Sequence, residues 1–305
     1  MIHSDTEMLE ILPKETPIPQ LFGMLIGAIG PRPIALASTL DREGNLNLSP
    51  FSFFNVFGAN PPLVVFSPSR RGRDKTTKDT YNNVKEIPEV VINVVNYAML
   101  QQVNLASSEF PKGVNEFEKA GFTPIKSHLI RPFRVKESPV QMECQVLQVI
   151  ETGFGGAAGN LVICKVAKIH VSKEVLNDAG KIDQHKIDLI GRMGGSLYCR
   201  ASGDAIFSLE KPGDIPPLGI DRLPEDIRNS PILSGNDLGQ LGGLQEYPNE
   251  KELEQIKADK RYASLINAYQ DRPKDLHKVL HQYAKELIAQ GNVKKAFGVL
   301  VALEY

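Results

Sequence analysis

The sequence has few cysteines and no tryptophan: three cysteines stand among 305 residues. They are Cys144, Cys164 and Cys199, an odd number at wide separations that form no metal-ligand spacing. We expect Cys144 and Cys164 to be small core residues, because both lie in apolar segments. With no secretory pattern in residues 1–20, this cysteine usage favours reduced thiols and a cytoplasmic location.

Long apolar runs and a charge imbalance are also missing. Apolar stretches such as 90–95 are far too short to span a bilayer, so no membrane partner is expected. The net charge of −1 argues against nucleic acid as a partner, because nucleic-acid binding needs a broad basic field. The remaining composition, 42% hydrophobic and 23% charged, is that of a globular protein with one large domain or two modest ones.

Strand patterns dominate the chain up to about residue 172. Ile34–Leu40 and 46–56 predict a hairpin whose turn, Asp41–Asn45, contains Gly44 for a positive φ. Further strands are predicted at 63–67, 90–95, 140–146 and 161–171. Hairpin connections favour a small closed or split barrel over a parallel sheet, which needs a helix after nearly every strand.

Helices are expected between and after these strands. Three prolines, Pro13, Pro17 and Pro19, predict an extended lead-in before Gly30. Short helices are predicted at 79–87, capped by Thr77 or Asp79, and at 97–106 and 114–120. Beyond residue 207 the pattern becomes helical, with segments at 276–288 and 296–303. We divide the chain into a domain at 1–206 and a helical extension at 207–305, packed on the barrel.

Polar side chains are concentrated where core strands would normally carry aliphatic ones. They are Ser38, Thr39, Asn47, Ser49, Ser52 and Asn55, gathered around Pro50 and Phe53. Each taken alone fits a surface position. Taken together they predict donors for a flat, polar-edged ligand, because Pro50 interrupts the ladder and leaves neighbouring backbone groups free.

A basic turn follows, with Arg70, Arg71, Arg73 and Lys75, and then Lys78-Asp79-Thr80 at the start of a predicted helix. Forked guanidinium donors and the free N–H groups of a helix start both bind phosphate. The alternative is a solvated run of charge. Next to the polar strands, the turn predicts a phosphorylated, planar cofactor.

Three other patterns give weaker evidence for a functional site. Residues 153–158 match G-x-G-x-x-A, but a strand-like segment follows them, which predicts a flexible hairpin and not a dinucleotide fold. His277 and His281 have the spacing of metal ligands on a helix, yet no third ligand is evident, so no metal is predicted. His185 stands alone and is more often structural than catalytic.

Several of these segments together resemble the flavin reductase-like, FMN-binding split-barrel family, over about residues 20–205. The resemblance rests on these segments: Pro31-Arg32-Pro33, Asn47-Leu48-Ser49-Pro50-Phe51-Ser52-Phe53-Phe54-Asn55, Pro61-Pro62-Leu63, Lys78-Asp79-Thr80, and Gly191-Arg192-Met193-Gly194-Gly195 with Tyr198. The helical extension after Phe207 departs from a minimal family member and leaves the substrate open.

The resemblance implies an α+β fold, mainly β with helices, built on a six-stranded antiparallel split β-barrel. It implies a homodimer with FMN near the subunit interface. The ring and ribityl contacts would be Ser38, Thr39, Ser49, Ser52, Phe53 and Asn55, with Asn47 and Pro50 beside them. The phosphate contacts would be Arg70, Arg71, Lys78 and Thr80, with Asp79 adjacent. Candidate catalytic residues are His185, Arg192 and Tyr198.

The function expected from this resemblance is that of an FMN-dependent oxidoreductase. Hydride would pass from NAD(P)H to the flavin, and electrons would leave to free flavin, a redox protein or another acceptor. No protein nucleophile or indispensable general base is expected. One alternative is a flavoredoxin-like electron carrier reduced by a protein partner, and another is a structural homodimer with an empty site.

Overall fold

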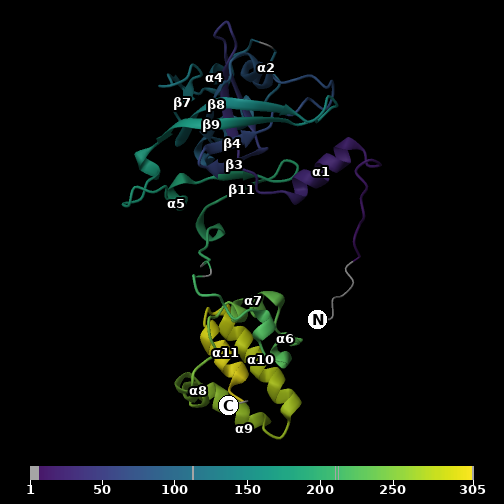
Figure 1. Ribbon diagram of the computed structural model, residues 1–305, viewed down its shortest axis with the longest axis vertical. Helices are drawn as coiled ribbons and strands as arrows, with labels where there is room; N and C mark the ends of the chain where they lie inside the picture. The colour runs from purple at the N-terminus through teal and green to yellow at the C-terminus, as the bar shows by residue number, and fades with distance from the viewer. Residues whose placement is uncertain (1–6, 112, 210, 212, 304–305) are drawn as a thin grey trace. The chain divides into compact units, whose positions relative to one another are not determined.

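The computed structural model describes residues 7–111, 113–209, 211 and 213–303. The chain divides into two compact units. One is Glu10–Phe207, called the barrel unit here; the other groups the N-terminal residues up to Leu9 with the chain from Ser208 onward and is called the helical unit. Both can be followed by colour in Figure 1. Among the described residues, no helix is both long enough and apolar enough to cross a membrane.

The barrel unit contains a seven-stranded antiparallel sheet in the order β2-β1-β5-β8-β9-β4-β3. The strands are β1 (Ala35–Leu40), β2 (Leu46–Phe51), β3 (Phe54–Ala59), β4 (Pro62–Phe66), β5 (Glu89–Val94), β8 (Val140–Glu151) and β9 (Asn160–Val171). The prediction of six strands is wrong by one. The stretch 46–56, predicted as one strand, breaks at Ser52 and Phe53 and forms β2 and β3.

This break explains how the sheet curves. β2 and β3 stand at opposite ends of the strand order, yet only Ser52 and Phe53 separate them in the chain. Three Cα steps span at most about 11 Å. The two edges of the sheet must therefore approach each other, so the sheet curls on itself and stays unpaired between β2 and β3.

The two longest strands, β8 and β9, form the predicted antiparallel pair and are joined by a hairpin over 152–159 (Figure 1). Cys144 and Cys164 lie on these strands and are fully buried among apolar side chains. Burial raises the pKa of the Cys144 thiol to about 12. Both are inert core residues, as the sequence predicted.

The helices of the barrel unit include one that the sequence analysis missed. Residues predicted as an extended lead-in form α1 (Ile18–Ala28). Pro17 is its N-cap and Pro19 lies in its first turn, where a missing N–H breaks no hydrogen bond and the fixed φ suits the helix. The prolines therefore mark the beginning of a helix.

Three predicted helical segments lie close to their predicted places: α2 (Asp79–Glu86), a 3₁₀ turn at Tyr97–Met99 that runs into α3 (Leu100–Ala106), and α4 (Glu116–Ala120). The short helix α5 (Gln184–Ile187) was not predicted. The predicted cap of α2 is wrong, because Lys78 is the N-cap and no side chain caps it. α4 ends as predicted at Gly121, whose φ is +67°. Two small sheets pair β6 (Pro124–Ile125) with β7 (Arg134–Val135) and β10 (Ile190–Arg192) with β11 (Tyr198–Arg200).

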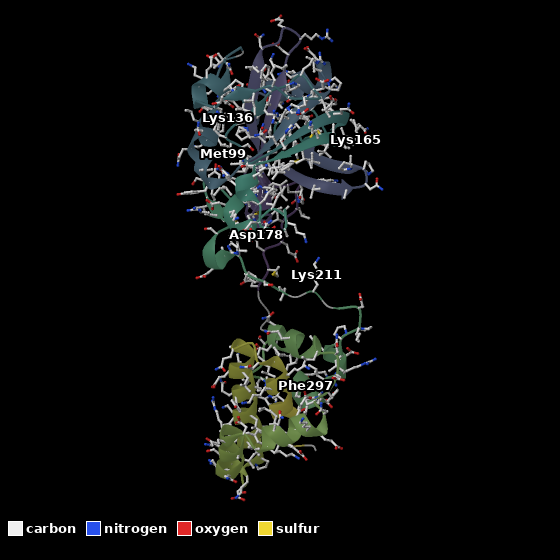
Figure 2. All side chains as sticks on the ribbon, turned by 90° about the vertical axis from the view of Figure 1, so that its left-hand side faces the viewer. Met99, Lys136, Lys165, Asp178, Lys211 and Phe297 are labelled. Carbon is white, nitrogen blue, oxygen red and sulfur yellow. The ribbon has the colours of Figure 1, made fainter. Side chains whose placement is uncertain are left out.

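The helical unit has a hydrophobic core of its own. Its helices are α6 (Glu225–Arg228), α7 (Gly235–Gly242), α8 (Glu250–Lys257), α9 (Lys260–Tyr269), α10 (Pro273–Ala289) and α11 (Val293–Val301). Phe297 on α11, labelled in Figure 2, is fully buried in this core against the ring of Tyr247. The helical character was predicted; packing of this unit on the barrel stays a prediction.

Candidate functional site

A large cavity of about 900 Å³ lies in the barrel unit. Four segments that are distant in the sequence meet around it: α1, the Ser52–Phe53 link, the basic loop 68–78 and the β8–β9 hairpin. One side of the cavity is apolar and is lined by Ile18, Phe22, Ile26, Phe51 and Phe53. Another part of the rim is basic and is lined by Arg70, Arg71, Arg73, Lys75 and Lys78. An amphipathic, anionic ligand fits such a lining.

The cations of the rim are not equivalent, because one carboxylate serves two of them. Glu109 lies 3.0 Å from Arg73 Nη2 and 3.7 Å from Arg71 Nε. Arg71 also donates to the backbone oxygen of Thr77 at 2.6 Å, which closes the basic loop. Arg71 and Arg73 are thus partly neutralised or engaged in holding the loop.

Lys78 has no such partner. The residue is half-buried, and its Nζ lies 5.4 Å from the centre of the Phe51 ring. Within the described part of the chain, no carboxylate lies at ion-pair distance from it. Burial, with the nearby charge of Arg71, lowers the pKa of Lys78 from its usual value. A buried cation without an anion is costly, so a bound anion would relieve this cost.

Arg70 likewise has an unused donor. Its Nη1 donates to the Lys75 backbone oxygen at 3.1 Å, and its guanidinium lies 5.4 Å from the centre of the Phe154 ring. Its Nε is buried and has no hydrogen-bond partner. Buried donors are nearly always satisfied, so an orphaned one beside a cavity indicates a ligand acceptor.

The β8–β9 hairpin holds the basic loop in place. Arg70 N donates to the Ala158 oxygen at 2.9 Å, and Ala157 N donates to the Arg70 oxygen at 3.2 Å. Gly156 lies so close that a Cβ there would stand 2.7 Å from the Gly72 oxygen. The sequence predicted the hairpin and rejected a dinucleotide fold correctly. It did not predict that the glycines bring this hairpin to the rim of the cavity.

Arg32 positions the apolar side of the cavity. Its Nη1 donates to the backbone oxygens of Ile26 and Ile29 at the end of α1, and its Nη2 donates to the Met193 oxygen at 2.8 Å. Burial, with nearby Arg192, lowers the pKa of Arg32. The cation thus ties α1 to the segment after β10, and its guanidinium lies 6.0 Å from the centre of the Phe53 ring.

The glycine-rich segment after β10 packs closely on its neighbours. A Cβ at Gly191 would meet Pro31 Cβ at 2.5 Å, and one at Gly194 would meet Gly27 Cα at 3.1 Å. Arg192 lines the cavity, donates to the Gly195 oxygen at 2.8 Å and stacks on Tyr198 at 4.5 Å. Tyr198 therefore supports Arg192 but does not line the cavity within this chain.

Three predicted hydroxyl and amide residues belong instead to a buried network beneath α2. Asn47 Nδ2 donates to Thr39 Oγ1 at 3.0 Å and to Thr80 Oγ1 at 2.9 Å. Asn83 Nδ2 also donates to Thr39 Oγ1, at 3.0 Å. These side chains join α2 to β1 and β2, so their role is to position the start of α2, where Lys78 stands.

The remaining predicted residues divide between the cavity and other places. Pro50, Ser52 and Phe53 line the cavity. Ser38 is fully buried, and its Oγ is unpartnered within the described chain. The others, Ser49, Asn55, Asp79 and His185, do not line the cavity. Asn55 accepts from the Val56 N–H, and the His185 N–H donates to the Asp183 cap of α5.

Residues that the sequence analysis missed come mainly from α1 and from serines beside the basic loop. They are Ile18, Phe22, Ile26, Ser67 and Ser69, together with Gly156 and Ala157. The apolar residues of α1 recur at a helical spacing that would have indicated an amphipathic helix. Reading the prolines as helix breakers concealed that signal.

Known proteins resemble this chain over about two thirds of its length. A protein of Aquifex aeolicus named as uncharacterized is 36% identical over 196 residues, which are 64% of this chain and 97% of that one. The crystal structure of nitrilotriacetate monooxygenase component B from Bacillus cereus is 33% identical, with a TM-score of 0.62, and covers 67% of this chain and 99% of that one. A putative flavin reductase with a split barrel domain from Shewanella frigidimarina is 25% identical, with a TM-score of 0.56, and covers 65% and 95%.

The family assignment comes from the region that builds the cavity. The sequence profile described as flavin reductase like domain matches residues 29–186, slightly more than half of the chain. This range contains β1 to β9, the basic loop and the β8–β9 hairpin. It excludes the helical unit, whose two parts lie before residue 10 and after residue 207. The chain therefore belongs to the flavin reductase-like domain family.

Proposed function

We propose that this protein is an FMN-dependent oxidoreductase that takes hydride from NAD(P)H and passes electrons to free flavin or another acceptor. The observation that carries the proposal is a pair of cationic groups that line a 900 Å³ cavity: Arg70, whose buried Nε has no hydrogen-bond partner, and Lys78, which has no ion-pair partner among the described residues. Family membership and the likeness to a flavin reductase support it. FMN combines a flat ring with a terminal phosphate and so matches a cavity with an apolar and a basic side.

The residues of the cavity fit the two ends of FMN. Arg70 and Lys78 would hold the phosphate, because charge-assisted hydrogen bonds to phosphate are the strongest that this rim offers. Phe53, Pro50 and the apolar face of α1 would contact the ring. Ser52 supplies a hydroxyl beside them. The side chains of Thr39, Asn47 and Thr80 are not among the proposed contacts, because they hydrogen-bond to one another.

The bound flavin would supply the chemistry of hydride acceptance and electron release. The protein would orient it, exclude water with the apolar residues of α1, and place positive charge near it. Arg192, held by Tyr198 and the Gly195 oxygen, is a further cation that lines the cavity. Since the hydrogen bonds of Arg32 already hold α1 in place, the proposed role of Arg192 is to bind an anionic group of the electron donor, and no protein base is needed.

Binding of FMN and of riboflavin tests the phosphate assignment. Arg70→Ala and Lys78→Ala should each weaken FMN by about 10- to 100-fold, as expected for losing a hydrogen bond to a charged group, and change riboflavin by less than about threefold. Arg73→Ala is the matched control, because Glu109 already neutralises Arg73. Equal losses for FMN and riboflavin would refute the assignment.

Stopped-flow reduction tests the enzymatic part of the proposal. Flavin bound to the purified protein should be bleached by NADH or NADPH under anaerobic conditions. Arg192→Ala should raise the KM for the nucleotide and leave FMN binding unchanged. Flavin that stays oxidised with both nucleotides would instead favour an electron carrier reduced by a protein partner.

A homodimer is the proposed assembly, and β3 offers a surface for it. β3 is an edge strand of the sheet, and Val56 and Phe57 on it are each 67% exposed. Exposed apolar side chains on an edge strand favour association with another chain. Phe57→Glu should convert a dimer to a monomer in size-exclusion chromatography with light scattering, whereas Leu129→Glu, at an exposed loop position, should not.

A further inference from the structure

The helical unit brings together three side chains that can bind a metal ion. His277 and His281 lie one turn apart on α10, and Asp226 on α6 faces them. Asp226 Oδ2 lies 3.7 Å from His277 Nδ1 and 3.7 Å from His281 Nε2. The sequence predicted no metal because it offered only two ligands. The fold places a third ligand, 51 residues earlier in the chain than the first histidine, against both.

The separations fit a shared metal better than hydrogen bonds. Zinc binds histidine nitrogen and carboxylate oxygen at about 2.0–2.2 Å, so two of its tetrahedral ligands stand about 3.4 Å apart. A hydrogen bond would bring nitrogen and oxygen to about 2.7–3.2 Å. At 3.7 Å both imidazoles are too far from Asp226 for a hydrogen bond and need to move only slightly to share an ion.

His281 also has a partner that fixes its ring. Its Nδ1 lies 2.7 Å from Ser230 Oγ, and its side chain is buried. Ser230 Oγ also accepts from the backbone N–H groups of Ile232 and Leu233. In the tautomer whose proton is on Nδ1, Nε2 carries the lone pair that faces Asp226, and this is the tautomer that binding of a metal ion at Nε2 requires. Metal-binding histidines are commonly oriented in this way by a hydrogen bond from the other ring nitrogen. His277 and Asp226 are accessible to solvent, with side chains 53% and 37% exposed, so an ion can reach the cluster.

A second group of potential ligands, in the barrel unit, lacks these properties. His128, Glu143 and His170 also lie close together. There, however, His170 Nε2 is only 2.6 Å from Glu143 Oε1, and the same carboxylate accepts from the backbone N–H groups of His128 and Leu129. Lys168 Nζ stands 2.9 Å from His128 Nδ1. Hydrogen bonds and a neighbouring cation satisfy this cluster, so it serves as a control.

We infer that Asp226, His277 and His281 form a binding site for a divalent transition metal of the zinc class in the helical unit. Three protein ligands leave one coordination position for water or an exogenous group. The ion would join α6 to α10 and so hold two elements of this core together. The inference does not depend on flavin binding, because every residue in it lies outside the family match.

Zinc binding by the full chain without an affinity tag tests the inference. After removal of metal with a chelator, titration calorimetry with zinc should show one tight site per chain. His277→Ala and Asp226→Asn should weaken that site at least tenfold, whereas His128→Ala should leave it unchanged. The melting temperature of the helical unit should rise with zinc in the natural sequence and in His128→Ala only.

Two further readouts keep the experiment decisive. Far-ultraviolet circular dichroism should show unchanged helix content in both exposed-site variants, because neither residue belongs to the core. FMN content should also be unchanged. Three outcomes would overturn the inference. The natural chain could bind zinc no more tightly than His277→Ala and Asp226→Asn do, only His128→Ala could lose zinc, or no zinc could bind at all.

Discussion

At the scale of single residues, the charge state of Lys78 controls the proposed phosphate contact. Burial lowers the pKa of Lys78, so this lysine loses its proton at a lower pH than the usual 10.5. The charged form exists below that pKa and binds phosphate, and the neutral form above it does not. Affinity for FMN should therefore fall as the pH rises toward the usual lysine value, and the fall should begin at a lower pH than for an ordinary lysine.

Riboflavin provides the comparison for this pH dependence, because it shares the ring and lacks the phosphate. The dissociation constant of FMN divided by that of riboflavin should rise about tenfold as the pH rises. Lys78→Met should abolish that movement. A ratio that is independent of pH in the natural chain would remove Lys78 from the phosphate site.

Sequence reasoning located charged residues better than uncharged polar ones. Arg70 and Lys78 were predicted as an anion site, and both line the cavity, where Arg70 Nε is buried without a partner. Thr39 and Asn47 were predicted as ligand contacts, and they bond to each other beneath α2. A serine or threonine is the same residue in a sequence whether its hydroxyl faces a ligand or a buried helix. Which of the two applies depends on what packs against the strand.

At the scale of elements, the β8–β9 hairpin and the basic loop form one unit. Gly156→Ala should push them apart, because the added Cβ would stand 2.7 Å from the Gly72 oxygen. We expect FMN affinity to fall about tenfold, since Arg70 is held by this hairpin. Gly155→Ala is the control, because no atom lies within 4 Å of the added methyl group. Fluorescence titration with FMN measures both; similar affinities would contradict the proposed coupling.

The network beneath α2 should contribute to stability. Asn47→Ala removes the donor to Thr39 and Thr80; Thr39 keeps its bond from Asn83, but the buried Thr80 hydroxyl loses its donor, which should cost about 1–3 kcal/mol in the free energy of unfolding. Amide hydrogen exchange in the peptides of α2 and β2 measures this loss within the intact protein. Asn82→Ala, at an exposed position on α2, should change exchange little. Equal protection in both variants would mean that the network is not stabilising.

At the scale of the whole molecule, the separate hydrophobic cores of the barrel unit and the helical unit predict that the two units unfold independently. A chain ending at Phe207 should keep the cavity and bind FMN with an affinity within about threefold of the full chain, because every cavity residue precedes that position. The segment from Ser208 onward should fold alone into helices, because it has its own buried cluster. Circular dichroism and FMN titration of the two pieces check this. A disordered helical piece would show that it needs the barrel unit to fold.

The sequence by itself determined the local elements, the basic turn, the hairpins and the family, because these depend on residues that are close together in the chain. Only the tertiary structure decided that the sheet has seven strands, that α1 lines the cavity and that Gly156 approaches the basic loop. It also decided that Asp226 joins His277 and His281. Each of these depends on segments far apart in the sequence, whose contacts are fixed by how the strands and helices pack and not by any local pattern.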